Sequence, residues 1–187
     1  MKNPLFLMFF LLFAACDTPP PDADRKPDAL FRTTQPSRLY FKNMRAYYYR
    51  HEVQQNTKTD LYTMRKLTQT GDQPALLPII ADNWLQDEAY IFFKQTPNAD
   101  IAEPLQLKWE DKSSGTHETF MLKSRNTRQQ YALARWMYKH LNEGHKFYYL
   151  NTANDWTTML EKPENRTSFL KTLQDYYALT EKTSKPD

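Results

Sequence analysis

The order of hydrophobic patterns along this chain constrains its fold more than any other feature. Several short apolar or alternating runs, which are typical of β-strands, precede the first segment with clear helical periodicity. A doubly wound sheet instead needs strands and helices to alternate along the sequence. We therefore predict an α+β fold: an antiparallel sheet of about six to seven strands, with two or three helices that come mainly from the C-terminal half.

The expected strands follow one another with polar loops between them. Residues 39–53 are dense in aromatic side chains and are predicted to form a strand, although Phe41, Met44 and Tyr48 also have helical spacing. Polar residues after this segment would form a hairpin loop to a second strand at 61–67. Further strands are expected at residues 76–81, 89–95, 105–110, 118–123 and 147–150.

Helical periodicity appears in the C-terminal third of the chain. Asn126 is a predicted N-cap, with a glutamine in the capping-box position three residues later. Gly144 is placed where a left-handed residue would end that helix. A short helix is expected after Asp155 and would stop at Pro163, and an amphipathic helix is expected over residues 167–180.

The first fifteen residues have the form of a signal peptide. An unbroken run of eleven apolar residues extends from Leu5 to Ala15 and follows a single lysine. A transmembrane helix needs about 20 such residues, so this run has the length of a signal-peptide core instead. The one cysteine of the chain, Cys16, follows at once.

Phe13-Ala14-Ala15-Cys16 resembles the lipobox of bacterial lipoproteins. In that family, small residues admit a signal peptidase, and the cysteine after them becomes the lipidated N-terminus. The resemblance implies that residues 1–15 are removed and that Cys16 carries the lipid that anchors the chain in a membrane. Phe13 departs from the family pattern, which usually has an aliphatic residue there.

The composition divides the remaining chain into a tether, one domain and a tail. Residues 17–36 hold five of the twelve prolines and few apolar side chains, which is typical of an extended spacer. We therefore predict a lipidated, proline-rich tether at 16–36 and a single globular domain at 37–182. The last residues, 183–187, are expected to be disordered.

Composition excludes several classes of function. A net charge of +3 is too small to indicate nucleic acid as a partner, and one cysteine excludes a disulfide framework or a multi-cysteine metal site. Three scattered glycines form no phosphate-binding loop. His140, Glu143 and His145 lie close in the sequence, but a helix end at Gly144 is expected to point the two histidines apart. We predict no metal site and no cofactor.

Two segments are candidate binding regions. Residues 38–51 interleave cations with aromatic rings, and the candidates among them are Tyr40, Arg45 and Tyr48. One interpretation is core packing with the cations reaching solvent; the other is an outward aromatic face that stacks on sugar rings.

The second segment, residues 82–88, contains Trp84, Asp87 and Glu88. It is either a strand connection with Trp84 packed at the edge of the core, or a recognition loop on a rigid sheet.

Two blocks of the body carry a further resemblance. Arg38-Leu39-Tyr40-Phe41-Lys42-Asn43 and residues 82–90 look like the corresponding blocks of an uncharacterised family of Bacteroidota lipoproteins. The resemblance covers about a fifth of the chain and implies no activity. It favours an outer-membrane over an inner-membrane destination in a bacterium with two membranes, with the domain facing the periplasm or the cell surface. Asp17, directly after Cys16, resembles an inner-membrane retention signal of enteric bacteria, whereas the acidic residues Asp17, Asp22 and Asp24 are also similar to surface-export signals of Bacteroidota lipoproteins.

These observations predict a lipid-anchored protein of the cell envelope. Its expected role is non-enzymatic: a binding or structural module for an envelope protein or a glycan, held at the membrane by its N-terminal lipid. The alternative is a hydrolase that acts on peptidoglycan or polysaccharide through two carboxylates, for which Asp82, Asp87 and Glu88 are the candidates.

Overall fold

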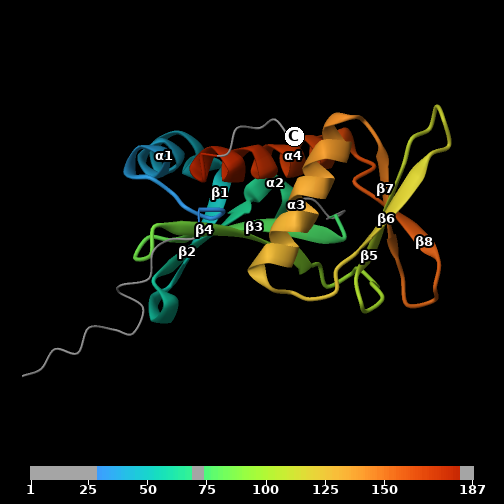
Figure 1. Ribbon diagram of the computed structural model, residues 1–187, viewed down its shortest axis with the longest axis horizontal. Helices are drawn as coiled ribbons and strands as arrows, with labels where there is room; N and C mark the ends of the chain where they lie inside the picture. Colours follow the sequence, from blue (N-terminus) through green and yellow to red (C-terminus); the bar gives the residue numbers. More distant parts are fainter. Residues whose placement is uncertain (1–28, 69–73, 182–187) are drawn as a thin grey trace, which may run out of the picture.

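Two segments of the chain, residues 29–68 and 74–181, are described by the computed structural model (Figure 1). Across these segments the strands form two antiparallel four-stranded sheets with helices packed beside them, which confirms the α+β prediction. The prediction of one sheet with six to seven strands is wrong, because the strands divide between two sheets. Within the same segments, no helix combines the length and the apolar composition needed to cross a membrane.

The first sheet is a meander in which each strand pairs with the next, in the order β1-β2-β3-β4. Its strands are β1 (Tyr49–Gln54), β2 (Thr59–Met64), β3 (Leu76–Asn83) and β4 (Glu88–Gln95). Ile80 on β3 lies opposite Ile91 on β4, and both side chains are fully buried. These positions agree with the apolar runs that predicted the strands.

The second sheet has the order β6-β5-β7-β8 and lies at one end of the first (Figure 1). Its strands are β5 (Gln106–Glu110), β6 (His117–Met121), β7 (Lys146–Leu150) and β8 (Trp156–Met159). Pro97 and Pro104 lie in the connection from β4 to β5, and neither can donate to a strand ladder. Ile101 in this connection bridges to Asn151, so the chain leaves the first sheet and β5 pairs with β7 instead.

Two long helices link the sheets. They are α3 (Thr127–Asn142) and α4 (Pro163–Leu179), and shorter helices are α1 (Gln35–Tyr40) and α2 (Arg65–Thr68). Helix α4 lies along the first sheet and α3 packs on β4 beside it (Figure 1). Ile80, Leu107, Met137 and Phe169 are all fully buried in one continuous core, so both sheets share it with both helices.

The segment that precedes β1 is helical, which corrects the predicted strand at 39–53. Helix α1 continues into a π-helical turn, η1 (Phe41–Arg45), and a 3₁₀ turn, η2 (Ala46–Tyr48). The start is a capping box, in which the Thr34 side chain accepts the amide of Ser37 and the Ser37 side chain accepts the amide of Thr34. Only the part of the predicted strand from residue 49 onward is a strand.

The folded part also begins earlier than residue 37. Phe31 is buried, and its carbonyl accepts the amide of Ala89 at 2.8 Å. The amide of Thr33 donates to the carbonyl of Asp87 at 2.8 Å. Residues 31–33 therefore pair with the start of β4 and the residue before it, and α1 begins directly after them, so this part of the predicted tether belongs to the fold. The predicted signal peptide, Cys16, the rest of the tether and the tail at 183–187 lie outside the described residues.

The short helix predicted after Asp155 is also wrong. Residues 156–159 form β8, which pairs with β7 at the edge of the second sheet. Pro163 stands at the first position of α4, where its missing amide hydrogen has no intrahelical partner to lose. It therefore begins a helix instead of ending one.

The predicted ends of α3 are confirmed. The side chain of Asn126 accepts the amide of Gln129 at 2.9 Å. At the other end Gly144 has φ +85°. Its amide donates to the carbonyl of Leu141, and the amide of His145 donates to the carbonyl of His140. These two backbone bonds define a Schellman motif, which folds the chain sharply back on the last turn of the helix.

Replacing Gly144 tests this turn. Because a side chain disfavours positive φ, we expect Gly144→Ala to lower the free energy of unfolding by about 1 kcal/mol in urea titrations. A Cβ atom at this position meets nothing within 4 Å, so the cost is one of backbone conformation alone. Gly144→Asn is the control and should cost less, since Asn adopts this conformation more readily. Equal losses in the two variants would contradict this account.

Candidate functional site

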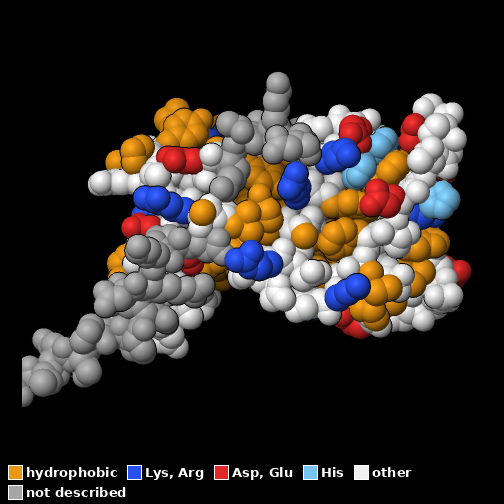
Figure 2. Space-filling model, in the orientation of Figure 1, with side chains coloured by type: hydrophobic (Ala, Val, Ile, Leu, Met, Phe, Trp, Pro, Cys, Tyr) orange, Lys and Arg blue, Asp and Glu red, His pale blue; other side chains and the backbone are white. Residues whose placement is uncertain are grey.

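Hydrophobic side chains gather on the outer surface of the segment from α1 to η2. We call this group the aromatic stripe; its members are Leu39, Tyr40, Met44, Tyr47 and Tyr48. Tyr47 is 82% exposed, and the other four are each about half exposed. Figure 2 shows hydrophobic side chains at this end of the molecule. Several large apolar side chains exposed on one short segment make that segment a candidate interaction surface.

The stripe faces outward because one neighbour in the same segment takes the inward position. Phe41 is 1% exposed, and its ring lies 5.0 Å from that of Tyr62 and 5.6 Å from that of Tyr49. The π-helical turn that starts at Phe41 widens the helix, a feature that is rare and often found at functional sites. The fold therefore buries one aromatic ring and displays the others.

Arg38 fixes the start of this segment to the first sheet. Its Nε lies 3.0 Å from Asp82 Oδ1 at the end of β3, and its Nη1 lies 3.0 Å from Asp87 Oδ1 in the β3–β4 loop. A third guanidinium nitrogen donates to the hydroxyl of Thr33 at 2.6 Å. Asp82 is fully buried, and this burial raises its pKa although Arg38 and Lys42 lower it in part.

Two further cations continue the attachment. Lys42 lies 3.3 Å from Asp60 on β2. Arg45 donates to both oxygens of Asp175 on α4 at 2.9 and 3.1 Å, and the hydroxyl of Tyr49 donates to the same carboxylate at 2.7 Å. The cations that the sequence interleaves with aromatic rings therefore hold the segment in place through buried or half-buried acids.

The structure brings the two candidate segments together through the contacts of Arg38. Among the candidates, Tyr40 and Tyr48 are exposed in the stripe, and the guanidinium of Arg45 lies 4.7 Å above the Tyr48 ring. Trp84 is 44% exposed in the loop between β3 and β4, so it is not part of the buried core.

The three carboxylates of the hydrolase hypothesis are all engaged by other side chains. Asp82 and Asp87 share the guanidinium of Arg38. Glu88 is 1% exposed and accepts a hydrogen bond from the hydroxyl of Tyr90. Asp82 and Glu88 are buried, whereas the side chain of Asp87 is 60% exposed while it pairs with Arg38. The arrangement therefore leaves only one of the three carboxylates open to solvent.

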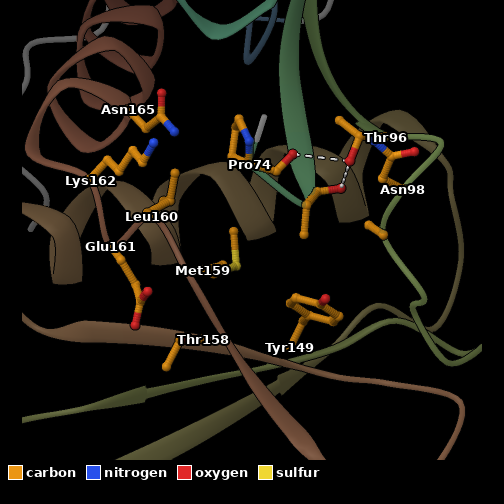
Figure 3. A pocket seen from close by; sticks show the side chains of 12 residues that line it. Pro74, Thr96, Asn98, Tyr149, Thr158, Met159, Leu160, Glu161, Lys162 and Asn165 are labelled. Carbon is orange, nitrogen blue, oxygen red and sulfur yellow. Dashed lines mark hydrogen bonds between the residues drawn. The ribbon is translucent and has the colours of Figure 1, made fainter. Parts of the chain in front are cut away.

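A cavity of about 530 Å³ lies elsewhere, between the ends of the two sheets (Figure 3). Tyr149 and Met159 line it from the second sheet, and Thr96 lines it from the end of β4. The hydroxyl of Thr96 lies within hydrogen-bonding distance of the carbonyls of Pro74 and Ala75. None of the six candidate binding residues from the sequence lines this cavity.

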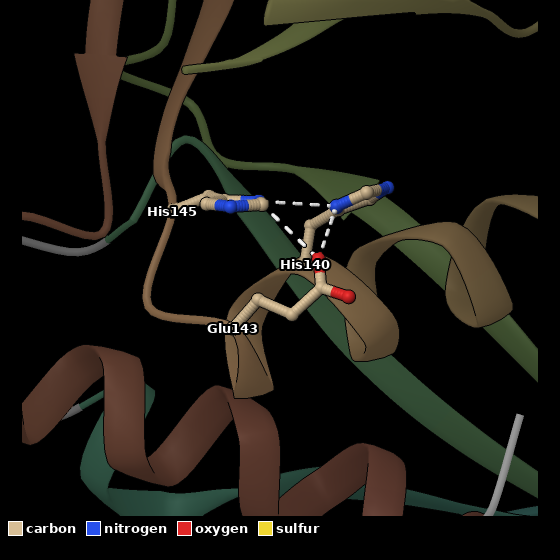
Figure 4. Close-up of side chains that lie close together, drawn as sticks. All are labelled: His140, Glu143 and His145. Atoms are coloured by element: carbon tan, nitrogen blue, oxygen red, sulfur yellow. Dashed lines mark hydrogen bonds and ion pairs between the residues drawn. The ribbon is translucent and has the colours of Figure 1, made fainter. Parts of the chain in front are cut away.

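The two histidines at the end of α3 point toward each other, contrary to the sequence expectation (Figure 4). His140 Nδ1 lies 3.1 Å from His145 Nδ1 and 2.9 Å from a Glu143 carboxylate oxygen. The same oxygen lies 3.4 Å from His145 Nδ1. The Schellman motif explains the error, because it brings the residue after Gly144 back onto the last turn of the helix instead of away from it.

Sequence reasoning also missed an aromatic and cationic group on the outer face of the second sheet. Lys108 Nζ lies 4.8 Å from the ring centre of Tyr148 and 5.0 Å from that of Trp156. The alternation of β5 places Lys108 on this face, and the pairing of β7 with β5 places Tyr148 opposite it. The alternating pattern of β5 could be recognised in the sequence, but its pairing with β7 could not.

In comparisons with protein-family models, curated proteins and solved structures, none was found to match this chain. The resemblance of two blocks to a Bacteroidota lipoprotein family therefore stays a prediction.

Removing Arg38 tests the attachment of the stripe. We expect Arg38→Ala to lower the free energy of unfolding by about 2–3 kcal/mol at pH 7, because it leaves the buried Asp82 carboxylate without its main partner. Folding raises the pKa of the Asp82 carboxyl, so its protonated form favours the folded state at low pH. This contribution to stability is lost as the pH rises through the pKa of Asp82 in the folded protein. Without the guanidinium the pKa of Asp82 rises further, so the cost should shrink toward pH 4.

The measurement is urea unfolding of both proteins at pH 7 and pH 4. Arg50→Ala is the matched control, since Arg50 and its partner Glu52 are both more than half exposed and the pair should contribute less than about 0.5 kcal/mol at either pH. A cost for Arg38→Ala that is equal at the two pH values would contradict the role given to Asp82.

Proposed function

We propose that this protein is a lipid-anchored, non-enzymatic module of the bacterial cell envelope that binds an envelope protein through the aromatic stripe. The observation that carries the proposal is the exposure of five large hydrophobic side chains on a segment whose position is fixed by ion pairs. A rigid apolar surface loses little conformational entropy when a partner covers it.

The composition of the stripe supports a protein partner. Tyrosine, methionine and arginine are enriched at protein interfaces, and tyrosine and arginine supply many of the residues that dominate binding energy. The ring centres of Tyr47 and Tyr48 lie 5.7 Å apart, and the guanidinium of Arg45 stacks on the Tyr48 ring. Trp84 and Leu85, both exposed in the β3–β4 loop, add apolar surface at the same end of the molecule.

The same geometry favours a protein over a sugar or an anionic membrane surface. The rings of Tyr47 and Tyr48 are inclined at 79°, so together they form no flat platform for a sugar ring. Arg38, Lys42 and Arg45 are neutralised by acids of the fold and do not form a cluster of charges that would attract anionic lipid heads.

The anchor rests on the lipobox-like sequence that ends at Cys16. The fold begins by Phe31, fifteen residues later, and an extended spacer of that length would reach roughly 45 Å. Two or more acyl chains hold a protein at a membrane much more firmly than one chain does. We place the module at the outer membrane, in accord with the family that the sequence resembles.

The hydrolase alternative has less support. Its three acids are engaged by Arg38 and Tyr90, and the cavity that the structure describes is lined by other residues. A general acid and a general base must both line the cleft that holds the substrate.

Photocrosslinking in intact cells tests the proposal. With a photoreactive phenylalanine at position 47, we expect one discrete protein adduct, which mass spectrometry identifies. With the purified adduct partner, Tyr47→Ala should weaken binding by at least about tenfold, because central exposed aromatics dominate such interfaces. Trp156 is the matched control, since it is also an exposed aromatic but lies on the second sheet, and it should give no adduct.

The anchor is tested in the same cells. Cys16→Ser should abolish labelling with radioactive palmitate and release the protein from the membrane fraction. Crosslinking of position 47 to lipid alone, or equal adducts from positions 47 and 156, would contradict the protein-binding proposal. Palmitate labelling that persists in Cys16→Ser would contradict the anchor.

A further inference from the structure

We propose that the end of α3 and the turn after it form a binding site for a divalent transition metal of the zinc class, with His140, Glu143 and His145 as ligands (Figure 4). The site is separate from the aromatic stripe. Helix α4 spans both regions: Arg166 near its start contacts the histidine turn, whereas Asp175 near its end holds Arg45.

The distances among the three ligand atoms fit one ion. The two imidazole nitrogens are 3.1 Å apart, and the carboxylate oxygen of Glu143 lies 2.9 and 3.4 Å from them. Zinc binds nitrogen and oxygen at about 2.0–2.1 Å, so ligand atoms at the corners of a tetrahedron are about 3.3 Å apart. Small side-chain adjustments would therefore place all three atoms on one metal ion.

The chemistry of the three atoms also points to a cation. Each neutral imidazole has one nitrogen with a lone pair, and the carboxylate oxygen is an acceptor only. The tautomer of each ring decides whether its Nδ1 carries the hydrogen or the lone pair. A hydrogen on either Nδ1 can be donated to the Glu143 oxygen, whereas a metal ion can accept lone pairs from both nitrogens and from the oxygen at once.

The surroundings hold the ligands before any ion binds. The amide of His145 donates to the carbonyl of His140 at 3.1 Å, and Arg166 donates to the carbonyls of His145 and Leu141 at 2.8 and 2.7 Å. These bonds fix the turn relative to the helix. The ligand side chains therefore need little ordering when they bind.

The indole of Trp109 covers both imidazoles. Its ring centre lies 4.4 Å from that of His140 and 4.2 Å from that of His145, with nearly parallel planes. Glu118 accepts from the indole nitrogen at 3.4 Å and faces Nε2 of His140 at 4.0 Å. A carboxylate that faces the outer nitrogen of a ligating histidine is the usual second contact at zinc sites.

The ligand set selects the class of metal. Two imidazoles and one carboxylate suit zinc, cobalt, nickel or copper, whereas calcium and magnesium prefer oxygen ligands alone. Three protein ligands leave a position for water or for a group from a bound molecule, so the site differs from a closed structural zinc site with four protein ligands.

Cobalt titration tests the site directly. The full-length chain is purified in detergent with Cys16→Ser, so that no thiolate competes for the ion. We expect Co²⁺ to bind with a stoichiometry of one and to give the visible absorption of a four- or five-coordinate ion, which added Zn²⁺ displaces. Because Trp109 stacks on both ligand rings, tryptophan fluorescence should be quenched in the same titration.

Two variants locate the site. Glu143→Gln and His145→Ala should each weaken Co²⁺ binding by at least about tenfold, and Glu143→Gln changes a half-exposed side chain that the core does not require. His117→Ala is the matched control, because His117 is exposed on β6 outside the cluster. Absence of the visible bands in the parent protein would overturn the proposal, as would equal affinities in the parent and Glu143→Gln.

Discussion

The ion pair between Arg38 and Asp82 is the contact on which the position of the aromatic stripe depends. It joins the first helical segment to the end of a central strand, and Asp82 is fully buried where the pair forms. Burying a charge is costly, so such a pair adds little net stability but penalises any arrangement that separates its members. The pair therefore favours one orientation of α1 on the sheet, and this orientation leaves the stripe in solvent.

Helix α4 carries this arrangement through the molecule. Phe169, Leu173 and Tyr176 are fully buried along its length, so the helix belongs to the core that both sheets share. Its C-terminal part holds the stripe through Asp175, and its N-terminal part holds the histidine turn through Arg166. The proposed binding surface and the proposed metal site are thus attached to one rigid element at separate positions.

Local patterns in the sequence predicted most of the strands and both ends of α3, because turn, cap and alternation signals act between near neighbours. Several errors arose where a local signal was misjudged, and two of them bear on the proposed sites. Thr34 starts a helix by capping, but the prolines before it indicated a tether. Gly144 was expected to separate His140 from His145, although a Schellman turn brings those positions together. The division into two sheets and the Arg38–Asp82 pair could not be predicted, because they join segments far apart in the sequence.

The most direct test of the central claim is hydrogen exchange of the backbone amides from residue 38 to residue 45, compared between the parent protein and Arg38→Ala. If the ion pair fixes this segment on the sheet, its amides are protected in the parent and exchange at least about tenfold faster in the variant. Amides of α3 from residue 133 to residue 141 should keep their rates. Equal rates in residues 38–45 of the two proteins would contradict the claim that Arg38 and Asp82 hold the stripe in place.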